Sequence, residues 1–176
     1  IIDYKSGSGS QTLIFDYTVG ADNSSQFLGY TSSSSLILNE ATIKDLQGNN
    51  SNIILPVPGE PNSLRSNTNI LFDTTVPIVN SVSFITDDGF YNQGDTILIA
   101  IIFNEDIYVE GVPLLLLNAG NNSAANFSQK SGNDTLIFEY IVQEGDNSYN
   151  LDYASSNSLS LNESFIRDLI GNDASV

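Results

Sequence analysis

The sequence predicts an all-β fold, organised as β-sandwich modules in tandem, and three observations lead to this prediction. Segments rich in β-branched residues, such as TILIAIIF (96–103) and TLIFEYIV (135–142), favour strands. Clusters of turn-forming residues, such as NQGD (92–95) and EGDN (144–147), separate these segments. With these turns between them, the predicted strands recur about every ten residues, which is typical of a β-sandwich. The third observation is an internal repeat, which indicates the tandem arrangement.

The repeat relates each residue to the one 123 positions later, without a gap. LILNEATIKDLQGNN (36–50) returns as LSLNESFIRDLIGND (159–173), and the whole of 1–53 matches 124–176. The middle of the chain, 54–123, occurs once. Self-similarity at a fixed period is the signature of tandem structural modules, so the chain holds one full period and an overlap.

The boundary between modules is expected at DTTVP (73–77), where a Pro-stiffened turn separates two apolar segments. Residues 1–72 are then the C-terminal part of one module, and 73–176 are the next module without its last strand segment. That last segment would resemble residues 53–73. Because a sandwich without it has an open sheet edge, we expect either a longer array or modules completed by strand exchange between chains.

The composition removes several classes of active site. The chain has no Cys, Met, Trp or His, which excludes disulfides, thiolate nucleophiles, imidazole metal ligands and a Ser-His-Asp triad. Paired acids such as Asp87/Asp88 and Glu105/Asp106 are the groups a glycosidase uses. Adjacent acids in turns are usually solvated, however, and no aromatic cleft is apparent in the sequence. We therefore expect no enzymatic activity.

The net charge of −16, from 5 basic and 21 acidic residues, restricts the partners. Nucleic acids and anionic membranes need a basic face, so neither is expected as a partner. Divalent cations fit this charge, and solubility of a surface protein would also explain it. No signal peptide is visible, and no apolar run reaches the length that spans a membrane.

The order of motifs along the chain resembles the Ig-like repeats of giant microbial cell-surface proteins, namely bacterial adhesins and cyanobacterial surface motility proteins. Those repeats read DTTAP, AGDTITITVTFSE, SGSGTNTLTFTYTV, LDY and IKDAAGN, and end in an LPxPG segment. The matching stretches of this chain are DTTVP (73–77), FYNQGDTILIAIIFNEDIYVEGVPLLLLN (90–118), the segment from SGND to SLSLN (131–162), IRDLIGND (166–173) and LPVPGEP (55–61).

The resemblance spans essentially the whole chain and implies tandem Ig-like β-sandwich modules in an extracellular, cell-surface setting. Repeats of this kind usually serve as structural extenders, whose neighbours are further copies of the same repeat. Two alternatives remain open at this point. The chain could be a filament subunit that assembles by strand exchange, or an adhesion module that binds a surface glycan.

A group of oxygen-bearing side chains is expected at one pole of the second module. In a seven-strand Ig sandwich, the chain entry, the loop after the second strand and the last inter-strand loop meet at one pole. Ca²⁺ binds six to eight oxygen ligands, which these segments could supply. Gly171 would let the last loop turn a carbonyl toward an ion. The candidate ligands are Asp73, Asn104, Glu105, Asp106, Asp168, Asn172 and Asp173.

The resemblance implies calcium at this pole, because in related adhesin repeats calcium at the module junction stiffens the array. By motif it assigns the ion to Asp73, Glu105 and Asp168, with FNE standing here in place of FSE. In the earlier copy the last loop carries Asp45. The alternative is that these residues are ordinary turn formers and that Asp168 hydrogen-bonds its own loop.

Two further features have functional and structural interpretations. Tyrosines recur in both copies, at Tyr17 and Tyr140 and at Tyr30 and Tyr153, which favours a packing role over a carbohydrate platform. Asn-X-Ser/Thr sequons would be glycosylation sites on a secreted eukaryotic protein, although they arise by chance in a chain rich in Asn and Ser. The sequons begin at Asn23, Asn49, Asn121, Asn126, Asn133 and Asn162.

Overall fold

A computed structural model describes residues 1–21, 23–120 and 123–176 of the chain. The prediction of an all-β fold is confirmed. The strands pair antiparallel, and the one helix in these ranges is the single turn α1 (Leu64–Asn67). The chain forms two compact units, Ile1–Thr74 and Thr75–Val176, so their boundary lies inside the DTTVP segment. None of the described helical residues forms a helix with the length and apolarity needed to cross a membrane.

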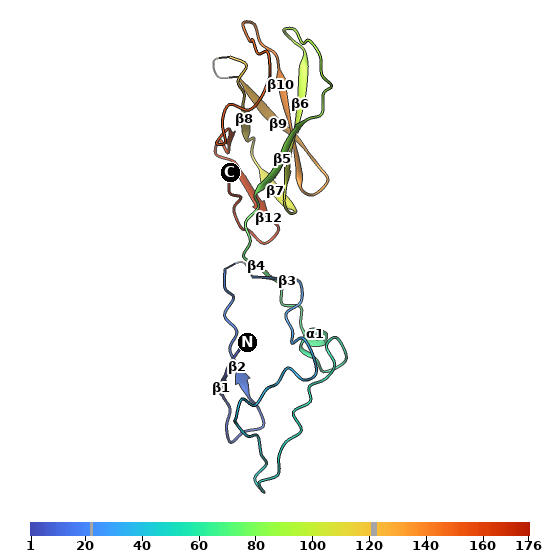
Figure 1. The fold of residues 1–176 in the computed structure, drawn as a ribbon, viewed down its shortest axis with the longest axis vertical. Coiled ribbons are helices and arrows are strands. Elements are labelled where there is room, and N and C mark those ends of the chain that lie inside the picture. The colour runs from blue at the N-terminus through green and yellow to red at the C-terminus, as the bar shows by residue number, and fades with distance from the viewer. Residues whose placement is uncertain (22, 121–122) are drawn as a thin grey trace. The chain divides into compact units, whose positions relative to one another are not determined.

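The second unit contains a six-stranded antiparallel sheet and a separate two-stranded sheet (Figure 1). The larger sheet has the order β11-β8-β9-β10-β6-β5. The smaller sheet pairs β12 (Phe165–Asp168) with β7 (Ile107–Glu110). The strands of the larger sheet are β5 (Val79–Phe84), β6 (Thr96–Phe103), β8 (Leu114–Leu116), β9 (Ala124–Ser131), β10 (Thr135–Ile141) and β11 (Leu159–Ser160).

Side chains of both sheets of the second unit meet in one hydrophobic core, which is the arrangement of a β-sandwich. The centre of the larger sheet is β10, which pairs with β6 on one side and with β9 on the other. Leu136 and Phe138 of β10 are completely buried there, as is Ile107 of β7 in the facing sheet. The β-branched residues that predicted strands 96–103 and 135–142 are therefore core residues of paired strands.

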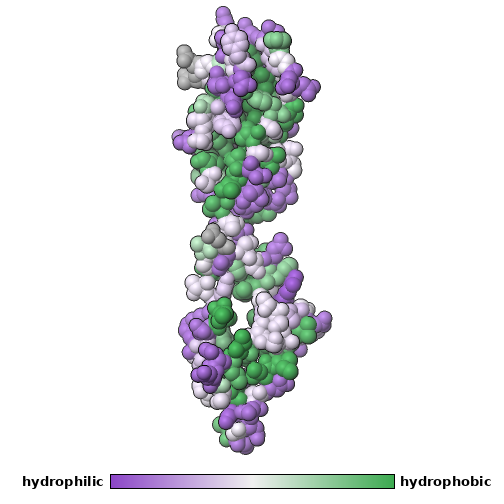
Figure 2. Space-filling view, viewed as in Figure 1, coloured by the Kyte–Doolittle hydropathy of each residue, from purple (hydrophilic) through white to green (hydrophobic). Residues whose placement is uncertain are grey.

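The first unit has strands but almost no buried side chains. It pairs β1 (Tyr4–Ser6) with β2 (Ile14–Phe15), and β3 (Ser24–Ser25) with β4 (Phe72–Asp73). Ser63 is its one buried residue among those that the structure describes. Many of its apolar side chains are exposed, and Figure 2 shows several of them on the visible face of this unit.

Candidate metal centre

The loop that follows β12 is built around the carboxylate of Asp168. Its Oδ1 accepts hydrogen bonds from the backbone N–H groups of Ile170 at 2.9 Å, Gly171 at 2.6 Å and Asn172 at 2.8 Å. Its Oδ2 accepts a hydrogen bond from the side-chain Nδ2 of Asn172 at 2.6 Å. Gly171 has a φ of 107°, which a residue with a side chain rarely adopts, so the DLIGN sequence is suited to this tight loop.

These hydrogen bonds keep Asp168 ionised although it is buried. Burial alone would raise the pKa of the carboxyl group, because it disfavours the charged form. The donors from the Asn172 side chain and from the three backbone N–H groups outweigh burial, and the pKa of Asp168 lies below its ordinary value. The loop therefore holds a fixed negative charge at this end of the second unit.

Glu105 follows β6 in a short loop whose backbone is fixed by its neighbour. The N–H of Ile78 donates to Asn104 Oδ1 at 2.8 Å, and the N–H of Asn104 donates to the carbonyl of Ile78 at 3.1 Å. The Glu105 side chain is half-buried, and its Oε1 atom is fully buried. A carboxylate oxygen at this depth attracts a small bound cation more strongly than an exposed oxygen does, because less water screens the interaction.

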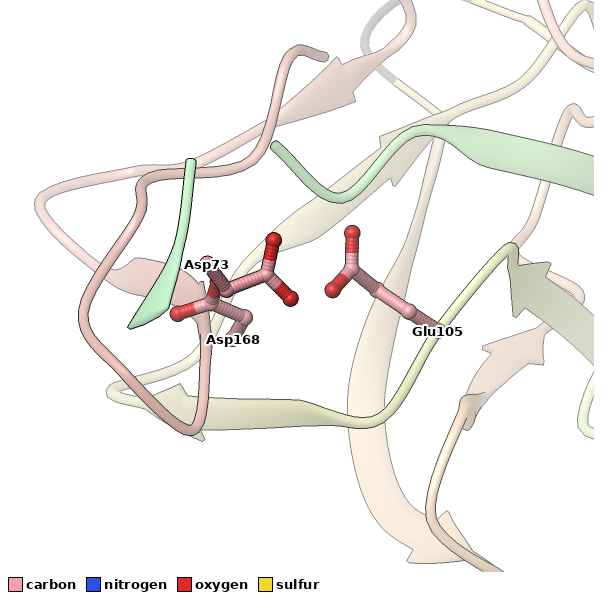
Figure 3. Close-up of side chains that lie close together, drawn as sticks. All are labelled: Asp73, Glu105 and Asp168. Atoms are coloured by element: carbon pink, nitrogen blue, oxygen red, sulfur yellow. The ribbon is translucent and has the colours of Figure 1, made fainter. Parts of the chain in front are cut away.

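The structure brings together three of the predicted ligands, Asp73, Glu105 and Asp168 (Figure 3). Each of them offers one carboxylate oxygen, and these oxygens lie within 4.8 Å of one another. Asp73 is the last residue of β4, on the chain segment that continues into the second unit. Carboxylate groups at this distance repel one another when they are charged, and a bound divalent cation would remove that repulsion.

Two of the other predicted ligands, Asn172 and Asp106, have different surroundings. Asn172 uses its side-chain nitrogen to hold Asp168, so in this structure it positions the carboxylate. Asp106 Oδ2 accepts a hydrogen bond from Asn133 Nδ2 at 3.2 Å, and Asp106 is outside the three-carboxylate group found among the described residues. Calcium binding by any of these residues stays a prediction.

The turn interpretation of the DxxGN motif is also supported, because the same loop forms in the first unit. Asp45 Oδ1 accepts from the N–H groups of Gln47 at 2.9 Å and Asn49 at 2.8 Å, and its Oδ2 accepts from Asn49 Nδ2 at 2.8 Å. The Asn49 side chain and backbone lower the pKa of Asp45 as well. The motif therefore makes a carboxylate-centred loop by itself, and the carboxylate group at Asp168 additionally needs Asp73 and Glu105.

The sequon asparagines lie in different environments. Asn126 and Asn133 are exposed, on β9 and in the turn before β10. Asn49 is exposed but donates to Asp45, and Asn23 accepts hydrogen bonds from Tyr17 and Gly20. Asn162 is exposed with a φ of 48°. Asn121 lies outside the described residues. Glycosylation stays a prediction at all of them.

Sequence reasoning missed a polar pair formed by the buried Tyr140 and the half-buried Asp146. The Tyr140 hydroxyl donates to Asp146 Oδ2, which also accepts from the N–H of Gln143 at 2.7 Å. Burial and the neighbouring carboxylate raise the pKa of Tyr140 to about 12, and the hydrogen bond from Tyr140 lowers the pKa of Asp146. The internal repeat could have revealed this pair, because Tyr17 and Asn23 occupy the corresponding positions of the first unit. There the Tyr17 hydroxyl donates a hydrogen bond to Asn23 Oδ1 at 3.1 Å.

In comparisons with known proteins, no protein-family model, no curated protein and no solved structure matches this chain.

Proposed function

We propose that this chain is part of a structural extender in an extracellular fibre or a giant surface adhesin. The observation that carries the proposal is the gap-free repeat of 123 residues, because modules written in tandem are suited to reach and stiffness. The loops of the two copies support it, since they adopt the same hydrogen-bonded form at Asp45 and Asp168. The Ig-like character of the modules and their cell-surface location rest on the motif resemblance.

Calcium bound by Asp73, Glu105 and Asp168 is the proposed stiffening element. Each of the three carboxylates offers one oxygen, and Ca²⁺ is bound by six to eight, so backbone carbonyls and water would supply the further ligands. An ion there would hold the segment around Asp73 to the loops that carry Glu105 and Asp168. If calcium binds the folded state alone, a hundredfold excess over its Kd stabilises that state by about 2.7 kcal/mol.

The test is a thermal melt of the chain in millimolar calcium and in excess EDTA. We expect calcium to raise the Tm, and Glu105→Gln to abolish most of this rise while leaving the Tm in EDTA nearly unchanged. Asp106→Asn is the matched control, because it removes an adjacent charge outside the carboxylate group. A Tm that is the same in calcium and EDTA would exclude calcium as the stiffening element, and the extender proposal would then depend on contacts between modules.

A second candidate function is a filament subunit that assembles by strand exchange. It is favoured by the exposed apolar side chains of the first unit, such as Leu13, Phe15 and Tyr17, which a strand from another chain could cover. This function predicts concentration-dependent oligomers, measured by light scattering after size-exclusion chromatography. A monomer over a wide range of concentrations would contradict it and would leave the extender proposal intact.

A further inference from the structure

The loops that follow β5 and β10 lie at the end of the second unit away from β12 (Figure 1). They line a cavity of about 380 Å³. Its lining is partly apolar, with Phe84, Tyr91 and Tyr140, and partly polar, with Asp146 and Ser148. Phe90 and Tyr149 also line it and are fully exposed to solvent. Exposed rings beside an open cavity are unfavourable in water, so they indicate a surface that another group covers.

The first unit shows what covers the corresponding loop there. Ser24 and Ser25 of β3 pair with Asp73 and Phe72 of β4. The N–H of Thr74 donates to the carbonyl of Asn23 at 3.0 Å, and the N–H of Asn23 donates to Thr74 Oγ1 at 2.9 Å. The loop of the first unit is therefore the docking edge for an extended strand.

Other residues of the segment 54–74 also contact this loop of the first unit, through a side chain and through backbone carbonyls. The rings of Phe72 and Tyr17 lie 5.7 Å apart, centre to centre. The N–H of Leu28 donates to the carbonyl of Ile70 at 3.1 Å, and the Tyr30 hydroxyl donates to the carbonyl of Pro56 at 2.7 Å. The strip from Asn23 to Tyr30 thus binds the ends of the segment 54–74 at two places.

The same strip exists in the second unit, 123 residues later. Asn23, Ser25, Leu28 and Tyr30 correspond to Asp146, Ser148, Leu151 and Tyr153. Its polar frame is the same, because Asp146 accepts from the Tyr140 hydroxyl and from the N–H of Gln143, as Asn23 accepts from Tyr17 and Gly20. A loop with the same internal hydrogen bonds can present the same edge to a strand.

In the second unit, the groups that would hold such a strand have no hydrogen-bond partner among the described residues. They are the N–H groups of Ser148 and Leu151 and the hydroxyl of Tyr153, which is 44% exposed. Tyr140 lines the cavity at the position where Tyr17 meets Phe72. Two backbone donors, one hydroxyl and an aromatic cavity thus repeat the first unit's arrangement with no strand in place.

We propose that the strip Asp146–Tyr153 and the adjoining cavity form a binding site for an extended strand with the pattern of residues 54–74. The aromatic side chain at the position of Phe72 enters the cavity beside Tyr140, and the backbone at the position of Ile70 accepts the N–H of Leu151. The carbonyl at the position of Pro56 accepts the Tyr153 hydroxyl. The partner is a strand of a repeat of this kind. This binding site rests on the proposed extender function and specifies how one repeat would join another.

The experiment titrates a synthetic peptide of residues 53–76 into the isotopically labelled 176-residue chain, followed by amide NMR spectra in EDTA. We expect saturable shifts at residues 146–153 and slower hydrogen exchange of the Ser148 and Leu151 amides. The amides around Asp168, at the other end of the unit, should not change. A matched peptide with F72D should bind at least about tenfold more weakly, since it places a charge in the aromatic cavity.

Two protein variants keep the site testable. Ser148→Pro removes a backbone donor of the strand edge and should abolish binding, whereas Tyr153→Phe removes one exposed hydroxyl, leaves the fold intact and should weaken binding about threefold to tenfold. Equal affinity of the F72D peptide, or no shift at residues 146–153 at a peptide concentration of about 1 mM, would overturn the proposal. Because the titration contains EDTA, that result would be independent of whether calcium stiffens the chain.

Discussion

The two copies of one strand sequence, TLIF(D/E)Y, have opposite environments in the two units. Leu136, Phe138 and Tyr140 are 0%, 0% and 3% exposed in the second unit. The corresponding residues of the first unit, 123 positions earlier, are 36%, 37% and 41% exposed. In the second unit the strand is seven residues long and pairs on both sides, whereas β2 is two residues long and pairs with β1 alone.

The difference follows from the middle segment, which the chain contains once. Residues 96–103 form β6, the partner that covers one side of β10, and residues 107–110 supply Ile107 to the facing layer of the core. The described residues of the first unit contain no counterpart of these strands. A strand sequence therefore specifies a preference for extended backbone, and its length and burial depend on the strands beside it.

The loops behave in the opposite way, because both copies adopt the same structure with or without a core. Asn39 and Glu40 have φ values of 45° and 68°, and their counterparts Asn162 and Glu163 have 48° and 64°. The N–H of Ser35 donates to the carbonyl of Ser32, and Ser158 and Ser155 repeat this bond, each at 3.1 Å. Hydrogen bonds between residues a few positions apart need no distant partner, so these loops are determined locally.

The largest expected effect comes from a strand position that is fully buried in the second unit and exposed in the first. Leu136→Ala should lower the free energy of unfolding of the second unit by about 2–5 kcal/mol, because it leaves a cavity in a packed core. Leu13→Ala changes the corresponding residue in the first unit and should cost less than about 1 kcal/mol. Urea unfolding followed by tyrosine fluorescence measures both. Equal losses would mean that Leu13 is packed in solution as Leu136 is.

Removing the central carboxylate of the DxxGN loop should give a smaller difference in stability between the two copies. Asp168→Ala should destabilise the second unit by about 1–3 kcal/mol, because it removes a buried carboxylate that accepts hydrogen bonds from three backbone N–H groups. Asp45→Ala removes the same hydrogen bonds from an exposed loop, where water replaces the acceptor, and its effect should be clearly smaller. Thermal melts in EDTA keep calcium out of this comparison. A larger effect at Asp45 would contradict the assignment of burial as the cause.

The Tyr140–Asp146 pair predicts a dependence of stability on pH at both ends of the range. The folded pKa of Tyr140 is raised from 10.0 to about 12, so its contribution is complete below pH 10 and is lost as the pH rises toward 12. The lowered pKa of Asp146 gives a contribution that is present above its ordinary 3.8 and lost as the pH falls below it. Tyr140→Phe should flatten the profile at both ends.

Urea titrations of the wild type and of Tyr140→Phe across pH 3 to 12 would measure this profile. Tyr17→Phe is the matched control, since Tyr17 is 41% exposed and donates to the neutral side chain of Asn23. Parallel profiles for the wild type and Tyr140→Phe would show that the hydroxyl does not depend on Asp146 in the folded state.

The smallest effect is expected at the surface ion pair of the second copy. Arg167 pairs with Asp173 at 2.5 Å and its guanidinium lies 4.4 Å above the Phe165 ring. Asp173 is largely exposed and Arg167 is partly exposed, so Arg167→Ala should cost about 0–1 kcal/mol, and the loss should shrink in high salt. Differential scanning calorimetry at low and high salt measures it. A loss that is independent of salt would point to stacking on Phe165 as the main contribution.

Much of the architecture was predictable from residues close together in the sequence. The β-branched runs predicted strands over 96–103 and 135–142, where β6 and β10 form. The chain also divides into two units between Thr74 and Thr75, inside DTTVP, whereas its division into two Ig-like repeats stays a prediction. The DxxGN motif predicted a loop at Asp168, and the pole argument predicted that Asp73 and Glu105 come near it. These features depend on turn-forming residues and on the order of the strands, and both can be read from sequence motifs.

Only the tertiary structure decided which strands are covered, which carboxylates face one another and which edges are left open. Glu105 and Asp106 are neighbours in the sequence, yet Glu105 joins the carboxylate group and Asp106 accepts from Asn133. The cavity beside Tyr140 was not predictable, because its lining comes from loops about fifty residues apart that β5 and β10 bring to one end of the sandwich. Local sequence fixes turns and preferences, whereas burial requires partners that only the folded chain assembles.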